Sequence, residues 1–226
     1  IVPAAILFDL GVGNAPDVRP TADCGLQAAT IASTSPVNEG NVGAGAGATV
    51  GKLRGGSRAM KGGLGRAAVT MPNGLTVAAL VAVNAVGDIL DPTTGKIIAG
   101  VRTEDGQSLA DARHLIRSGE ISRLPQAENT TIGVVATNAV LTKSQAKKIA
   151  QMAHDGLART IVPAHTPVDG DTIFAIATGK LSGAPDMLTI GALAAEVMAE
   201  AVVRAVRQAT SIPGYPAARD FDLSHP

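Results

Sequence analysis

The stretch Glu128-Asn129-Thr130-Thr131-Ile132-Gly133-Val134-Val135-Ala136-Thr137-Asn138 predicts a buried strand that begins beside a hydroxyl group. The β-branched residues after Asn129 favour extended, packed backbone, so Thr130 would be held rigidly at the mouth of the strand. A threonine hydroxyl is a weak nucleophile unless a base takes its proton. If the peptide bond before Thr130 were cut, the freed α-amino group could be that base.

The same pattern also fits a plain strand that opens after a turn, and the motif alone favours this simpler interpretation. Downstream, Thr142 and Gln145 form a capping-box pattern at the start of a helix of about four turns. A second strand is predicted from Asp171 to Thr178, and an amphipathic helix from Leu188 to Gln208.

Upstream of the junction the pattern is more irregular. Pro72-Asn73-Gly74 predicts a hairpin turn between two strands. The other predicted elements are strands over 1–10 and 96–100, helices over 23–33 and 109–116, and a surface linker over 103–128. Strand pairs between helices indicate a layered α/β sandwich, although the pattern does not order the strands.

Composition favours one compact domain. The 226 residues are 46% apolar but only 2% aromatic, so the core must be built from small and branched side chains. Acidic and basic residues are equal in number, 19 each, so the chain has no net charge that would attract it to nucleic acid or a membrane. The single cysteine, Cys24, excludes an internal disulfide and is predicted to be a small buried apolar residue.

The glycine-rich region around Gly43 to Lys52 is not a phosphate loop. Gly51-Lys52 has Ala46 where a P-loop needs glycine, and Leu53 where it needs Ser or Thr. Gly43 to Ala48 fits a loose dinucleotide pattern, but no convincing strand precedes it and no acid follows at the ribose-binding distance. For Lys52, the residues alone favour a solvated loop charge.

Two carboxylates flank a glycine in Asp169-Gly170-Asp171, directly before the second predicted strand. In extended backbone both side chains point the same way, so their like charges would raise one pKa unless a partner intervenes. A calcium loop is excluded because its remaining ligands are missing. His165 has no nucleophile elbow to serve and is expected to stabilise the loop through hydrogen bonds. No metal site is expected.

Several of these segments together resemble one family. Asn129-Thr130 is similar to the self-processing junction of the DmpA-type aminopeptidase and nylon-oligomer hydrolase family, and residues 165–175, HTPVDGDTIFA, are similar to its HT-x-x-DGDT-x-FA signature. The glycine-rich segment ending in Gly51-Lys52 and the strand-end Asn84 also match. The resemblance covers most of residues 1–208.

The resemblance implies an αββα four-layer sandwich like that of the N-terminal-nucleophile hydrolases, with its own connectivity. It implies cleavage into residues 1–129 and 130–226, with Thr130 as the nucleophile of an amide hydrolase that needs no cofactor. Asn84 would hold the oxyanion, Lys52 and the glycine-rich loop with Gly45 and Gly47 would line the cleft, and Asp169 and Asp171 would orient the nucleophile. Without the resemblance, Asn84 would be expected only to satisfy a turn.

One position departs from the pattern, because Phe8 stands where nylon-oligomer hydrolases carry tyrosine and has no hydroxyl to offer. That difference bears on substrate choice more than on catalysis. The expected substrates are short peptides, β-peptides or other small amides, and we expect a cytoplasmic homo-oligomer of cleaved units. Because the sequence starts with an apolar run and no Met, we also expect the natural chain to continue upstream of Ile1.

Two other functions fit the residues. An acyltransferase resembling ornithine acetyltransferase would pass the acyl group to an amine instead of water. A non-catalytic ligand-binding protein of the same fold would stay uncut.

Overall fold

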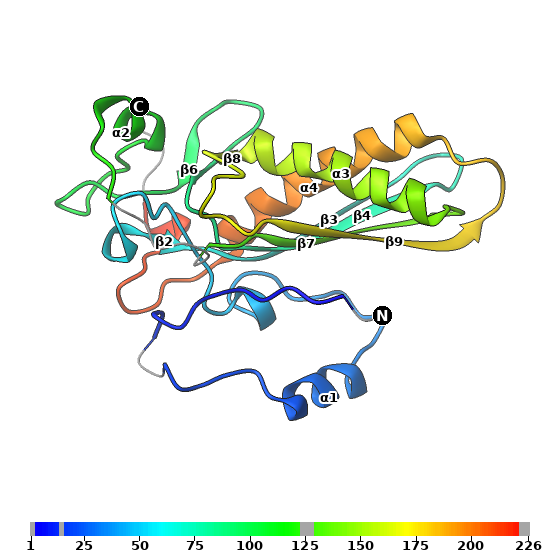
Figure 1. The fold of residues 1–226 in the computed structure, drawn as a ribbon, viewed down its shortest axis with the longest axis horizontal. Helices are drawn as coiled ribbons and strands as arrows, with labels where there is room; N and C mark the ends of the chain where they lie inside the picture. Colours follow the sequence, from blue (N-terminus) through cyan, green and yellow to red (C-terminus); the bar gives the residue numbers. More distant parts are fainter. Residues whose placement is uncertain (1–2, 14–15, 123–128, 222–226) are drawn as a thin grey trace.

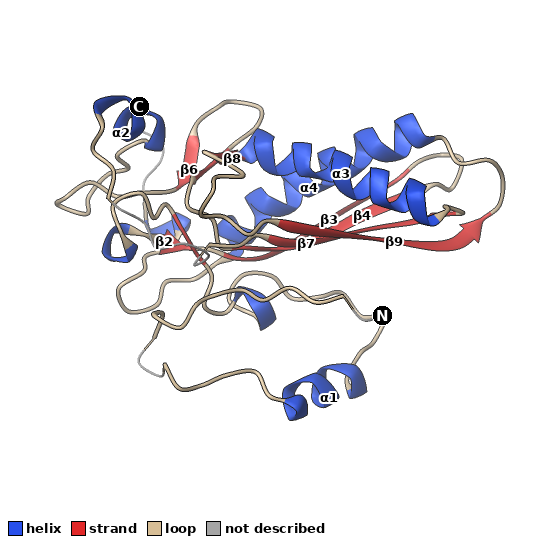
Figure 2. Cartoon of the chain, viewed as in Figure 1, coloured by secondary structure: helices blue, strands red, loops and turns tan. Residues whose placement is uncertain are grey.

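The computed structural model describes residues 3–13, 16–122 and 129–221, and its centre is a four-stranded sheet in the order β3-β4-β7-β9 (Figures 1 and 2). β4 (Thr76–Val83) pairs antiparallel with both β3 (Gly63–Thr70) and β7 (Ile132–Ala139). β9 (Thr172–Leu181) lies parallel to β7. The predicted hairpin is confirmed, since the β3–β4 turn holds Pro72-Asn73-Gly74.

Two long helices cover one face of this sheet (Figure 1). α3 (Lys143–Thr160) begins with the predicted capping box between Thr142 and Gln145. α4 (Met187–Gln208) is capped by Asp186, whose carboxylate accepts from the N–H groups of Leu188 and Thr189. The core between helices and sheet is built from alanine and branched aliphatic side chains, as the composition predicts.

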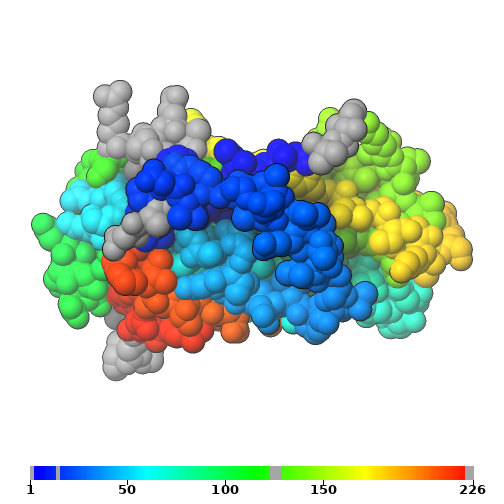
Figure 3. Space-filling view, turned by 90° about the horizontal axis from the view of Figure 1, so that it is seen from below, coloured from blue at the N-terminus to red at the C-terminus, as the bar shows by residue number. Residues whose placement is uncertain are grey.

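Residues 3–13 and 16–30 lie on the opposite face of the sheet and include the helix α1 (Ala22–Thr30) (Figures 1 and 3). The α/β class is confirmed. In the part of the chain that the structure describes, one helical layer and the central sheet of the expected sandwich are present. Side chains of β9 on the face away from the helices remain accessible, and Ile176 is 53% exposed.

Shorter elements surround one end of the central sheet. β5 pairs with both β6 and β8 in a small antiparallel sheet, and β1 pairs with β2. Their bounds are β1 Thr49–Val50, β2 Met60–Lys61, β5 Asp88–Leu90, β6 Ile97–Ala99, β8 Ile161–Val162 and α2 Ala112–Ser118, with 3-10 turns at Gly43–Gly45, Gly56–Arg58 and Ala218–Asp220.

The N-terminal segment differs from the prediction. Residues 3–10 form a loop, not a strand, because none of the described strands pairs with them. Ile6 is 82% exposed. Cys24 is exposed rather than buried, because α1 buries none of its residues against the rest of the described chain.

The helix predicted over 109–116 forms slightly later, as α2, because Asp111 caps it by accepting from the Arg113 N–H. Residues 123–128, the end of the predicted linker, lie outside the described residues. None of the helices in the described ranges has the length and apolar character needed to cross a membrane.

Candidate active site

The topology brings three strand ends together. β4 and β7 are antiparallel, so the end of β4 at Val83 lies beside the start of β7 at Ile132. β7 and β9 are parallel neighbours, so they start at the same edge. Asn84, Thr130 and the Asp169 loop therefore meet, although they are far apart in the sequence.

The Asn129–Thr130 peptide is held by backbone on both sides. The Thr130 N–H donates to the Asn84 carbonyl oxygen at 3.0 Å, and the Gly170 N–H donates to the Asn129 carbonyl oxygen at 2.7 Å. Thr130 is only 7% exposed. Its hydroxyl lies beside Gly170, because a Cβ built on that glycine would stand 3.0 Å from Thr130 Oγ1. Glycine thus leaves room for the hydroxyl next to the Asn129 carbonyl.

The side chain of Asn84 is oriented by donors on one side. Lys52 Nζ donates to Asn84 Oδ1 at 2.6 Å, and the Thr49 N–H donates to the same oxygen at 3.0 Å. Because two donors contact this atom, it is the oxygen of the amide and not the nitrogen. The amide nitrogen then faces Phe8, and Nδ2 donates to the Phe8 carbonyl oxygen at 3.1 Å. Lys52 Nζ also lies 3.4 Å from the Asn84 backbone oxygen, which accepts from Thr130.

The two aspartates bond to the residues around Thr130. Asp171 Oδ1 accepts from the Thr131 N–H at 2.9 Å, and its Oδ2 lies 2.9 Å from Nδ1 of His165. His165 therefore contacts the loop acid, in agreement with its expected role. The ring of His154 packs edge-on against that of His165, with centroids 4.9 Å apart.

Asp169 is half-buried and bonds to the loop that precedes it. Its Oδ2 accepts from the Thr166 hydroxyl at 2.5 Å, and its Oδ1 from the Val86 N–H at 3.4 Å. Burial raises the pKa of Asp169, and the nearby charge of Asp171 raises it further, while the Thr166 hydrogen bond opposes the shift. The direction agrees with the expectation for two neighbouring carboxylates. In this continuous chain, neither carboxylate hydrogen-bonds to Thr130 itself.

The glycine-rich loop is fixed by a lysine that sequence reasoning did not single out. Lys61 is fully buried, and its Nζ donates to the carbonyl oxygens of Gly45 at 2.8 Å, Ala48 at 2.7 Å and Gly62 at 3.1 Å. Burial lowers the pKa of Lys61 to about 8. Within this loop Gly45 is buried, whereas Gly47 lines a cavity.

Sequence reasoning also missed several backbone and hydroxyl contributors, namely Gly170 N–H, Thr49 N–H, Val86 N–H and Thr166 Oγ1. Thr166 and Gly170 stand inside the recognised HT-x-x-DGDT-x-FA segment, which was a usable signal. Phe8 is placed at the site through its carbonyl oxygen, and its side chain is 37% exposed. Among the residues that the structure describes, no cluster of His, Cys, Asp and Glu could hold a metal ion.

Comparison with known proteins gives a consistent result. The model of peptidase family S58 matches residues 1–219. The chain is 40% identical to an uncharacterized aminopeptidase of Mycobacterium tuberculosis, covering 98% of this chain and 67% of that protein. It is 30% identical to a 6-aminohexanoate-oligomer endohydrolase of Kocuria sp., covering 92% of this chain and 61% of the relative.

Solved structures share the fold. A Burkholderia sp. β-aminopeptidase matches with a TM-score of 0.59 and 27% identity, over 86% of this chain and 53% of that one. The L-aminopeptidase D-Ala-esterase/amidase of Ochrobactrum anthropi, described as a variant of the Ntn hydrolase fold, matches with a TM-score of 0.56 and 23% identity, over 82% of this chain and 51% of its own. The chain thus spans about half the length of these solved proteins.

Proposed function

The chain belongs to peptidase family S58, and we propose that it hydrolyses small amide bonds after cutting itself between Asn129 and Thr130. The observation that carries the proposal is the hydrogen bond of 2.7 Å from the Gly170 N–H to the Asn129 carbonyl oxygen, with the Thr130 hydroxyl beside it. A donor on this oxygen polarises the carbonyl toward attack.

Self-cleavage would proceed by attack of Thr130 Oγ on the Asn129 carbonyl carbon. The carbonyl oxygen becomes an oxyanion that accepts from the Gly170 N–H. The C–N bond then breaks, and the proton that the Thr130 hydroxyl releases goes to the Thr130 nitrogen, which becomes an amine. The product is an ester between Asn129 and the Thr130 hydroxyl. Water then hydrolyses this ester to the Asn129 carboxylate, and Thr130 is left with a free hydroxyl and a free α-amine.

In the mature enzyme the same hydroxyl would attack the substrate carbonyl, and the α-amine of Thr130 would take its proton. Lys52 Nζ and the Thr130 nitrogen share the Asn84 backbone oxygen, at 3.4 Å and 3.0 Å. A neighbouring ammonium disfavours protonation of the amine, so Lys52 would keep that base neutral. The leaving amine takes the proton back, and water releases the acyl group.

The oxyanion of this second reaction would be held by Asn84. Because Lys52 and Thr49 fix Oδ1, the Nδ2 group keeps one N–H for the substrate oxygen besides the one given to Phe8. Asp171 accepts a hydrogen bond from the Thr131 N–H and contacts His165, and through these bonds it would position the Thr130 backbone. Asp169 would do the same from the Thr166 side.

The names of the relatives suggest the substrates. They are an aminopeptidase, a β-aminopeptidase and an endohydrolase of 6-aminohexanoate oligomers, so short chains of amide-linked amino acids are the proposed class. No cofactor takes part in the steps above. We also propose that two pieces, 1–129 and 130–226 of this stretch, remain associated and assemble into a homo-oligomer.

A pair of adjacent variants tests the nucleophile. Thr130→Val should leave one uncut chain without hydrolysis, measured by intact mass under denaturing conditions and N-terminal sequencing. Thr131→Val is the matched control, because the Thr131 hydroxyl is buried without a hydrogen-bond partner among the described residues. That control should be cut and active. A cut or active Thr130→Val protein would overturn the mechanism, and release of the acyl group to added amine instead of water would indicate an acyltransferase.

A further inference from the structure

A cavity of about 650 Å³ lies between the N-terminal segment, the glycine-rich loop and the chain around Tyr215. This volume is in the range of ligand pockets. Among the described residues along its wall, Asp9 carries the one formal charge, and the others are apolar, glycine or tyrosine. The cavity therefore combines a carboxylate with a mostly apolar lining.

The Asp9 carboxylate rests on Gly47. A Cβ built on Gly47 would stand 2.1 Å from Asp9 Oδ2, so any side chain there would displace the carboxylate. No donor among the described residues hydrogen-bonds to this carboxylate. Lys61 attracts it electrostatically, but the Lys61 ammonium is buried behind the loop and gives its three N–H bonds to backbone carbonyls. Asp9 thus lines the cavity, and its carboxylate accepts no hydrogen bond from the described part of the chain.

Two segments that line the cavity also hydrogen-bond to Asn84, the candidate oxyanion residue. Next to Asp9, the Phe8 carbonyl accepts from Asn84 Nδ2 at 3.1 Å. Two residues after Gly47, the Thr49 N–H donates to Asn84 Oδ1 at 3.0 Å. A substrate whose carbonyl lies at Asn84 would therefore extend one end toward this cavity.

We propose that Asp9 binds the free ammonium group of the substrate. A carboxylate without a bonded cation is complementary to an ammonium, and a charge-assisted hydrogen bond in a partly buried site is strong. The aromatic ring of Tyr215 on the same cavity adds a surface that attracts cations. The inference rests on the proposed amide hydrolysis and assigns the residue that would select amine-bearing substrates.

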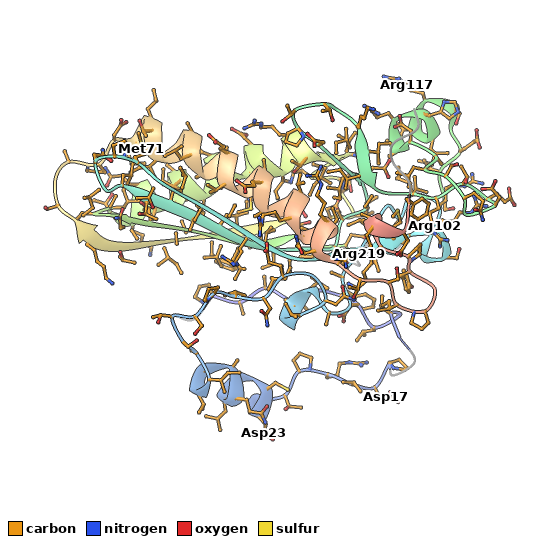
Figure 4. The ribbon with its side chains drawn as sticks, turned by 180° about the vertical axis from the view of Figure 1, so that it is seen from behind. Asp17, Asp23, Met71, Arg102, Arg117 and Arg219 are labelled. Atoms are coloured by element: carbon orange, nitrogen blue, oxygen red, sulfur yellow. The ribbon has the colours of Figure 1, made fainter. Side chains whose placement is uncertain are left out.

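The experiment compares two substrates on three proteins. One substrate is alanine p-nitroanilide with a free amine, and the other is its N-acetyl derivative. Wild type should prefer the free amine, and Asp9→Asn should lower kcat/KM for that substrate about 10–100-fold, mainly through KM, with little change for the acetylated one. Asp23→Asn is the matched control, because Asp23 lies on α1 and points away from the sheet (Figure 4). It should behave as wild type.

Gly47→Ala gives a second, independent route to the same result, because its methyl group would push the carboxylate away while Asp9 keeps its charge. It should reduce the preference for the free amine as Asp9→Asn does. Equal preference in wild type and Asp9→Asn, with both proteins cut at Thr130, would overturn the role of Asp9 and leave the proposed hydrolysis standing. An uncut, inactive wild type would overturn both.

Discussion

The Gly170 N–H donates to the Asn129 carbonyl oxygen at 2.7 Å, which joins the loop before β9 to the residue before β7. This hydrogen bond extends the parallel β7–β9 pairing by one step past the regular strands, through the bridge between Asn129 and Asp169. The carbonyl proposed to be attacked is therefore held by the sheet itself. Such a donor needs no reorganisation when charge develops on the oxygen.

Gly170→Ala should slow self-cleavage. The added methyl group would stand 3.0 Å from Thr130 Oγ1, so either the hydroxyl or the Gly170 N–H must shift. Because loss of one oxyanion donor lowers rates by about 100-fold or more, a partial displacement should slow cleavage by roughly tenfold. The measurement is the fraction of cut chain against time after synthesis, by intact mass. Gly25→Ala is the control, since its Cβ would meet no atom within 4 Å, and it should be cut at the wild-type rate. Equal rates for both variants would contradict the role of Gly170.

Lys52→Met should change the pH dependence of hydrolysis. With the ammonium removed, the α-amine of Thr130 would hold its proton to higher pH, so less of it would be a free base near neutrality. We therefore expect the acid limb of the kcat/KM profile to move to higher pH, with a larger loss at about pH 7 than at about pH 9. Asn84 also loses its donor at 2.6 Å, so a uniform loss will accompany the shift. A uniform loss without any shift would assign Lys52 to Asn84 alone.

Because of Asp88, the free energy of unfolding should fall as the pH rises from about 4 to about 6. It is 1% exposed, and burial raises its pKa to about 6 although the N–H groups of Val101 and Ala112 donate to it. In this interval the folded state holds the proton and the unfolded state does not, so deprotonation costs folding free energy, in total about 3 kcal/mol. Urea unfolding at several pH values should show the full fall in wild type and in the exposed-residue control Asp17→Asn, and a smaller fall in Asp88→Asn, where Asp169 still contributes. A fall of equal size in Asp88→Asn would place its origin elsewhere.

Local signals in the sequence predicted the elements whose stability is local. Thr142 and Gln145 cap α3 as expected, and Pro72-Asn73-Gly74 turns β3 into β4. The apolar residues 3–8 were misleading, because hydrophobicity indicates a tendency to burial but does not supply a neighbouring strand. Sequence patterns therefore predict an element well when its hydrogen bonds lie within it.

The site divides in the same way. The family resemblance pointed to Asn84, Lys52 and the two aspartates, and the structure brings all of them around Thr130. Backbone donors such as the Gly170 N–H leave no trace in residue type, since any residue other than proline has one. Asp9 and Lys61 were not singled out from the sequence, because their environment depends on long-range packing.

Lys61 should show the opposite pH dependence to Asp88. Burial lowers its pKa from 10.5 to about 8, so between these values the unfolded state binds the proton that the folded state has lost. The free energy of unfolding of wild type should therefore rise with pH over this range, by up to about 3 kcal/mol. Lys61→Met should lose this rise.

The Lys61→Met protein should also be less stable than wild type at neutral pH by roughly 2–4 kcal/mol, because the carbonyls of Gly45, Ala48 and Gly62 would lose their donor. Since Gly45 and Ala48 belong to the loop that places Thr49 against Asn84, self-cleavage and hydrolysis should slow together in this variant. Chemical unfolding at pH values from about 7.5 to 10.5 measures the first effect. A Lys61→Met protein with wild-type stability at neutral pH and an unchanged rise would show that the lysine is not held by these carbonyls.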